Sequence, residues 1–169
     1  MLLLDDDFDE IVFGAIDKYQ DVELKAVNKA STSEDFKEEA EAAKDKTEEL
    51  KPLIEKIRTA LGDRVKDVKA SVRLADSPSC IVSDEDEPSM QMQQMLRAMG
   101  QNSLPAMKPT LEINPDHEIV KKLLATTDDA VINDAAFLLL DQALLIEGVP
   151  VENPGAFVQR LNRVLTRAV

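Results

Sequence analysis

The chain has 169 residues, 44% of them hydrophobic, which is enough for one domain with an appendage and argues against a disordered chain. Its 33 acidic and 20 basic residues give a net charge of -13, whose field repels phosphate backbones and anionic lipids. We therefore expect no nucleic acid and no membrane as partners. No apolar run approaches the roughly 20 residues that span a bilayer, and three aspartates follow Met1–Leu4 at once, so neither a signal peptide nor an anchor is expected. The only thiol, Cys80, cannot form an internal disulfide, which fits a reducing, cytoplasmic location.

Residues 1–30 predict a fragment that is too small to bury a core of its own. Residues 2–4 read as a strand and residues 24–27 as a second strand. Between them, an amphipathic helix is predicted to carry Phe8, Ile11, Val12 and Ile16. Residues 31–49 are rich in charge and begin with a capping box, which indicates a solvated helix or acidic helical linker. We expect one further domain over residues 50–169.

The domain over residues 50–169 is predicted to be α+β, with a small three-stranded antiparallel sheet and helices. It begins with a helix whose stripe is Leu50, Leu53, Ile54, Ile57 and Leu61. Gly62 suits the end of this helix, and Pro52 should kink it or mark its first turn. Residues 68–74 alternate as a strand does, and residues 80–82 and 110–113 are short apolar strands. After Asn114 the pattern is helical, with Asn-Pro pairs as N-caps at residues 114 and 153.

The segment of residues 88–100 carries four of the six methionines of the chain. Met92, Met95, Leu96 and Met99 fall on one face of a helix. Methionine adapts to irregular partners because its side chain is unbranched and polarizable, so a promiscuous binding face is one interpretation. Packing on the chain's own sheet is the other, and spacing alone favours it. The acidic run before the segment and the proline-containing loop after it favour a segment that stands away from the domain.

The last two predicted helices should pack as an antiparallel hairpin because only a short Gly-Val-Pro connection joins them. Residues 131–147 are apolar around more of the helix than one buried face requires. The last helix adds a stripe of Phe157, Leu161, Val164, Leu165 and Ala168. A second copy of the hairpin would cover the surplus in an intermolecular four-helix bundle. Covering by the chain's own sheet and first helix is equally compatible with the pattern.

The pattern of reactive side chains predicts no catalytic residue and no metal site. The acidic run that begins at Asp84 lacks the glycine and distal glutamate of a calcium loop. His117 is the only histidine, and its place in the first turn of a helix favours capping or surface placement over metal binding or general-base work. Cys80 is expected to be a buried packing residue of a strand without redox function. The glycines are scattered, so no phosphate-binding loop is expected.

Four strings resemble the C-terminal domain of the ninety-kilodalton heat-shock chaperones. They are S-V-R-L-A-D-S-P-S-C-I-V-S-D from Ser71, M-Q-M-Q-Q-M-L-R-A-M-G from Met90, L-E-I-N-P-D-H-E-I-V-K-K-L from Leu111 and L-L-D-Q-A-L-L-I-E-G from Leu139. The closing N-P-G-A-F-V-Q-R-L-N-R-V-L resembles the last helix of that family. Residues 1–30 resemble the end of the family's middle domain, so the chain looks like a fragment. The chain ends without the acidic co-chaperone motif of eukaryotic members and without a retention signal, which favours the bacterial branch.

The resemblance implies a constitutive homodimer that also binds unfolded or partly folded client proteins. The implied client-binding residues are Met90, Met92, Met95, Leu96 and Met99. The implied dimer interface is Phe137, Leu140, Ala143, Leu144, Phe157, Leu161, Val164 and Leu165. ATP and magnesium bind an N-terminal domain in the family, so this chain should hold no cofactor and should not hydrolyse ATP. The alternative is a helical adaptor that binds one defined protein partner.

Overall fold

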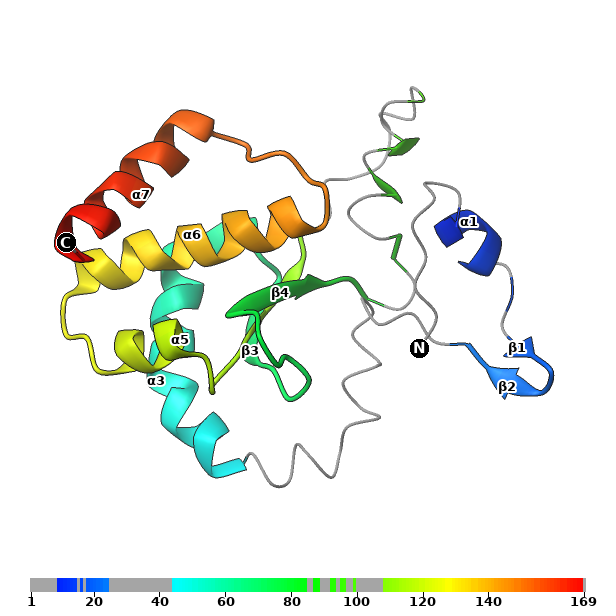
Figure 1. Cartoon of the computed structure of the whole chain (residues 1–169), viewed down its shortest axis with the longest axis horizontal. Coiled ribbons are helices and arrows are strands. Elements are labelled where there is room, and N and C mark those ends of the chain that lie inside the picture. Colours follow the sequence, from blue (N-terminus) through cyan, green and yellow to red (C-terminus); the bar gives the residue numbers. More distant parts are fainter. Residues whose placement is uncertain are drawn as a thin grey trace.

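The computed structural model describes residues 9–14, 16, 18–24, 44–84, 87–88, 92–93, 95–96, 99 and 108–168. Its elements in chain order are α1 (Asp9–Gly14), β1 (Lys18–Tyr19), β2 (Val22–Glu23), α3 (Lys44–Leu61), η2 (Gly62–Arg64), β3 (Asp67–Ala70), β4 (Ser79–Val82), β5 (Thr110–Ile113), α5 (Glu118–Leu124), α6 (Asp129–Ile146) and α7 (Pro154–Ala168). Figure 1 shows α3 and α6 beside the sheet, with the C-terminal end of α7 near the start of α6 and its other end splayed away. The predicted α+β class is confirmed.

The three-stranded sheet has the order β3-β5-β4, and it is mixed. β4 pairs with β5 in antiparallel register, with Ile81 opposite Leu111, whereas β3 runs parallel to β5, with Val68 also opposite Leu111. The prediction of a purely antiparallel sheet was therefore wrong. It assumed that strands next to each other in the sequence also pair, but β5 lies between β3 and β4.

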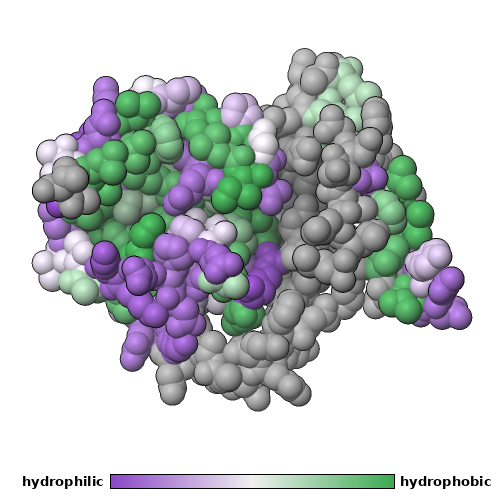
Figure 2. All heavy atoms as spheres, viewed as in Figure 1, coloured by the Kyte–Doolittle hydropathy of each residue, from purple (hydrophilic) through white to green (hydrophobic). Residues whose placement is uncertain are grey.

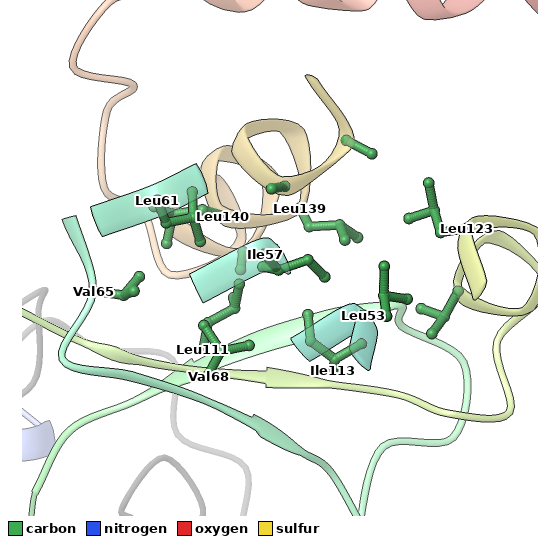
Figure 3. Packing of buried hydrophobic residues seen from close by; sticks show 14 of the residues in the cluster. Leu53, Ile57, Leu61, Val65, Val68, Leu111, Ile113, Leu123, Leu139 and Leu140 are labelled. Atoms are coloured by element: carbon green, nitrogen blue, oxygen red, sulfur yellow. The ribbon is translucent and has the colours of Figure 1, made fainter. Parts of the chain in front are cut away.

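One face of the sheet packs against α3 and α6 to form the hydrophobic core. Figure 3 shows side chains of α3, α5, α6 and the sheet converging there. Ile57, Leu111, Ile113 and Val120 are fully buried, and Leu139 and Leu140 are almost so. The stripe predicted from Leu50 to Leu61 points inward as expected, with Ile54 half-buried at its edge. α3 begins at Lys44 and continues through Pro52, so it crosses the boundary expected at residue 50.

The helices of the second half begin at capping residues, and Asn153 was predicted as one of them. His117 caps α5 by accepting a hydrogen bond from the Ile119 amide at 3.2 Å, and Asn153 caps α7 by accepting one from Ala156 at 3.0 Å. The prediction that Asn114 is an N-cap was wrong. Its side-chain amide is buried and donates to the carbonyl oxygens of residues 75 and 77, which fastens the segment before β4 to the end of β5.

The N-terminal piece contains α1 and a two-stranded hairpin of β1 and β2. Gln20 and Asp21 form the turn, both with positive φ (48° and 64°). Two positive-φ residues suit the twist of a short hairpin, but the usual signal for it is Asn-Gly, which is absent here. The hairpin was therefore not predicted. A strand was expected over residues 24–27, but Leu24 follows β2, and residues 25–27 lie outside the described residues.

Candidate functional site

The candidate site is the outer surface of the hairpin formed by α6 and α7. Three contacts along the two helices show that they run antiparallel, as predicted. The Arg167 side chain near the end of α7 bonds Asp128, the N-cap of α6, at 2.8 Å. Arg163 bonds Asp134 one turn further along, and the Arg160 guanidinium lies 4.0 Å from the centre of the Phe137 ring. The residue numbers rise on one helix as they fall on the other, and these contacts join the first half of α6 to residues 160–167 of α7.

The structure divides the predicted dimer-interface residues between the core and the surface. Leu140, Ala143 and Leu144 are buried in the chain's own hydrophobic core. A second chain cannot reach them while the core is intact. Phe137, Phe157, Leu161 and Val164 are half-buried and Leu165 is exposed. The part of the set that a partner could contact therefore lies mainly on α7.

Three further apolar side chains on this surface lie within residues 137–146 and 157–165, the segments from which the resemblance draws the dimer contacts. Leu145 is 47% exposed, Ile146 is 70% exposed and Val158 is 50% exposed, values similar to the 51% of Leu165. Figure 2 shows hydrophobic atoms gathered over α6 and α7 on the face turned to the viewer. Because α6 is apolar around most of its circumference, its periodicity alone could not say which side chains face outward.

The flank of the hairpin nearest the core carries charged groups around Phe137. The guanidinium groups of Arg64 and Arg160 lie over the Phe137 ring, at 5.6 Å and 4.0 Å from its centre. Arg64 also donates to the buried Asp141 at 3.4 Å. Burial raises the pKa of Asp141, because it penalises the charged carboxylate more than the nearby arginines favour it. Phe137 is thus engaged within the chain rather than free on the surface.

Asp134 is the best-paired carboxylate of the hairpin. Its two oxygens accept hydrogen bonds from Arg163 Nε at 2.7 Å and Nη2 at 2.6 Å, a bidentate pair. The hydrogen bond from Arg163 holds the pKa of Asp134 below its usual value. The carboxylate is therefore ionised at neutral pH, and the pair is a fixed point of contact between α6 and α7.

The methionine segment is described in part. Residues 92–93 and 95–96 are helical, and the Met99 amide donates to the Met95 carbonyl oxygen at 3.0 Å. Met92, Met95 and Leu96 are half-buried, whereas Met99 is 68% exposed. Met90 lies outside the described residues. Gln93, which was not predicted as a site residue, is buried and donates to the Pro88 carbonyl oxygen at 3.2 Å.

The face of the sheet opposite the core carries a buried polar cluster. Glu112 Oε2 accepts hydrogen bonds from Arg73 Nε at 3.0 Å and from Ser71 Oγ at 3.1 Å. The side chains of Arg73 and Glu112 are only 8% and 5% exposed. The Sγ atom of Cys80 lies 3.8 Å from the same carboxylate oxygen. Cys80 is on a strand as predicted, but it is half-buried rather than buried.

The environment of Cys80 predicts a slow thiol. Desolvation, together with the Glu112 charge, raises the pKa of Cys80 to about 11. Because the thiolate is the nucleophile, a shift of about two units lowers the reactive fraction near neutral pH by about 100-fold. We expect a disulfide reagent at pH 8 to modify the native chain at least about 100-fold more slowly than the urea-unfolded chain. Equal rates in the two states would show that the thiol is not held in this environment.

Among the residues that the structure describes, no three histidine, cysteine, aspartate or glutamate side chains gather in a group that could hold a metal ion. Within the same residues, no helix combines the length and the apolar character that crossing a membrane requires.

Comparison with known proteins identifies the family. The model of a family described as Hsp90 protein matches residues 1–169. The chaperone protein HtpG of Treponema denticola is 47% identical over 168 residues, which are 98% of this chain and 26% of that protein. HtpG of Treponema pallidum is 46% identical over 169 residues, or 99% of this chain and 26% of that protein. HtpG of Wolinella succinogenes is 43% identical over 171 residues, or 100% of this chain and 28% of that protein.

The chain thus spans about a quarter of the length of the relatives that it matches. The match runs through the strings on which the sequence resemblance was based. It confirms that resemblance at the level of the family, and the chain belongs to the Hsp90 protein family.

Proposed function

We propose that the chain is the C-terminal dimerisation domain of a bacterial Hsp90-family chaperone, and that it also contributes an amphipathic helix to client binding. The proposal joins two kinds of support. The relatives are named chaperone protein HtpG, and the strings that resemble the family's C-terminal domain run from Ser71 to the last helix. In this proposal, ATP and magnesium are bound by a part of the whole protein that lies outside this chain.

The observation that carries the dimer proposal is the apolar outer surface of the α6–α7 hairpin. Exposed Leu145, Ile146, Val158 and Leu165, with half-buried Leu161, form what we name the hairpin surface. Both helices contribute to it, and the four exposed members keep 47% to 70% of their surface open to solvent. A second copy supplies the same surface in a two-fold arrangement, because an isologous contact requires only one self-complementary patch. The four helices would then form the intermolecular bundle that the sequence pattern allowed.

Co-purification tests self-association directly. A tagged and an untagged copy of the chain are produced together, and the tagged copy is captured. We expect the untagged chain in the eluate in comparable amount, because random pairing of two copies yields mixed dimers. Mixing the two copies after purification, at low concentration and for a short time, controls for association that occurs only on the capture resin. An eluate that holds the tagged chain alone contradicts the dimer proposal.

The methionine segment supports the client-binding part of the proposal because none of its described apolar side chains belongs to the core. For the double change Met95→Ala and Met99→Ala, we expect the free energy of unfolding to fall by less than about 1 kcal/mol. Burying a methionine against a client contributes about 1.5 to 3 kcal/mol, so affinity for an unfolded protein should fall at least tenfold. Denaturant unfolding and fluorescence anisotropy with a labelled, denatured protein measure the two quantities.

The matched control is Ile119→Ala, which removes an apolar side chain that is 45% exposed on α5, away from the methionine segment. Client affinity should not change in this control. Several unrelated unfolded polypeptides are compared, since saturable binding of only one would favour a helical adaptor with a defined partner. Lower stability together with unchanged binding per folded molecule would make the methionine segment a packing element.

A further inference from the structure

The attachment of α7 to the rest of the chain is unusually polar. None of its residues 154–167 is buried, and its apolar side chains are half-buried or exposed. α6 by contrast has nine buried residues and contributes to the core throughout its length. Because hydrophobic burial normally sets the rotation of an amphipathic helix on its domain, another kind of contact must set the rotation of α7.

Three arginines on one side of α7 supply that contact. Arg160, Arg163 and Arg167 are spaced by three and four residues, so they project from neighbouring positions of the helix. Arg160 lies over Phe137 of α6 and Arg163 bonds Asp134 of α6. Arg167 bonds Asp128, the N-cap of α6. The central pair is the strongest in geometry, since it is bidentate and the Asp134 side chain is only 12% exposed. A bidentate pair fixes direction as well as distance.

The apolar side of α7 lies opposite Arg163 on the helix. A residue in an α-helix is rotated by about 100° from its neighbour, so positions 161 and 165 both lie about 160° from position 163. When Arg163 is held on α6, Leu161 and Leu165 are directed away from it, consistent with the exposure of Leu165. Without that restraint, the apolar stripe of α7 would gain burial by turning onto its own domain.

We propose that the Asp134–Arg163 pair is a positioning contact that holds the apolar stripe of α7 outward, ready for a second copy of the chain. This inference rests on the proposed dimer, because the outward stripe is the part of the hairpin surface that α7 contributes. The pair acts within one chain and does not itself touch the partner in this proposal. It raises affinity by setting the rotation of α7 before association, which removes a rearrangement that the monomer would otherwise have to make.

The test replaces Arg163 by methionine, which removes the charge but keeps a long side chain that suits a helix. We expect the dissociation constant of the dimer to rise at least about tenfold in Arg163→Met, and by less in Arg163→Lys, which keeps the charge but loses the bidentate geometry. The control Arg167→Met removes a pair whose partners are 52% and 51% exposed, and it should change the constant by less than about threefold. Sedimentation velocity over a dilution series measures all three variants.

A second readout follows the rotation of α7 without relying on the dimer. In a Cys80→Ser background, Leu165→Cys places a thiol on the outward stripe, and its reaction rate is measured at concentrations where the chain is monomeric. Adding Arg163→Met should slow this thiol at least about threefold, because the stripe turns inward. An unchanged rate together with an unchanged dissociation constant overturns the inference. If the parent chain never dimerises, the proposed function fails, while the thiol rates still decide whether the pair positions α7.

Discussion

A chain that carries Leu145→Asp together with Leu165→Asp is expected to sediment as a monomer at concentrations where the parent chain is a dimer. Both side chains are about half exposed, 47% and 51%, so aspartate at either position stays hydrated in the monomer. In a two-fold bundle the same groups would be desolvated without partners, at a cost of several kcal/mol each. Association should weaken by at least about a thousandfold. Sedimentation velocity measures the association, and circular dichroism checks that the helical content is kept.

The matched control places aspartates at exposed apolar positions off the hairpin surface. Ile119→Asp with Leu124→Asp changes the net charge equally, at side chains of α5 that are 45% and 40% exposed. This control should remain a dimer. Leu140→Asp with Leu144→Asp would not serve, because both leucines are buried in the chain's own core and their loss would unfold the monomer. A fully dimeric Leu145→Asp/Leu165→Asp variant would show that the hairpin surface is not the interface.

The largest effect on stability is expected at the buried ion pair of the sheet. Glu112 lies on the central strand β5, and its carboxylate accepts hydrogen bonds from Arg73 and Ser71. Glu112→Ala removes this acceptor. Removing one partner of a buried pair leaves the other charge in a desolvated place, and such changes cost about 3 to 5 kcal/mol. We expect a loss of that size in the free energy of unfolding, measured by denaturant titration with an unchanged slope.

An exposed ion pair provides the control for this loss. Glu48 and Lys51 pair at 2.6 Å on α3, with side chains that are 67% and 60% exposed. Glu48→Ala should change the free energy of unfolding by less than about 1 kcal/mol, because solvent screens the pair. A loss below about 1 kcal/mol in Glu112→Ala as well would mean that the cluster contributes little and that β5 is held by the core alone.

Much of the fold could be predicted from local signals. The stripe from Leu50 to Leu61 has the helical period throughout, and the structure buries its main members as expected. The short strands around Cys80 and over residues 110–113 were found because each is a brief apolar run bounded by turn residues. The cap at Asn153 was predicted because its side chain suits the free amides of a helix start, whereas for His117 both capping and surface placement had been left open.

The features that were missed depend on contacts between distant segments. The parallel pairing of β3 with β5 is decided by the order of strands in space, and short-range alternation carries no information about that order. Asn114 looked like a cap from its following proline, but α5 begins only at Glu118. The Asn114 side-chain oxygen accepts from the Asp116 amide of the preceding turn, and its NH2 group donates to the carbonyls of residues 75 and 77. The division of α6 into a core face and an outer face could not be predicted, because apolar residues occur on both.

The candidate site was predicted as two helices rather than as a surface. Leu161 and Leu165 could be proposed from the clear stripe of α7, whereas Leu140 and Leu144 were assigned to an interface although the core uses them. The charged contacts between the helices were not anticipated either. Asp134 and Arg163 are far apart in the sequence, and only the antiparallel packing of α6 and α7 brings them together.

The mass of the unmodified chain in solution tests the central claim most directly. Sedimentation equilibrium at micromolar concentration gives this mass without assumptions about shape. The hairpin surface predicts twice the mass of one chain, with dissociation appearing only on strong dilution, since two helices from each copy bury their exposed apolar side chains together. A mass equal to one chain across the micromolar range would contradict the proposed function.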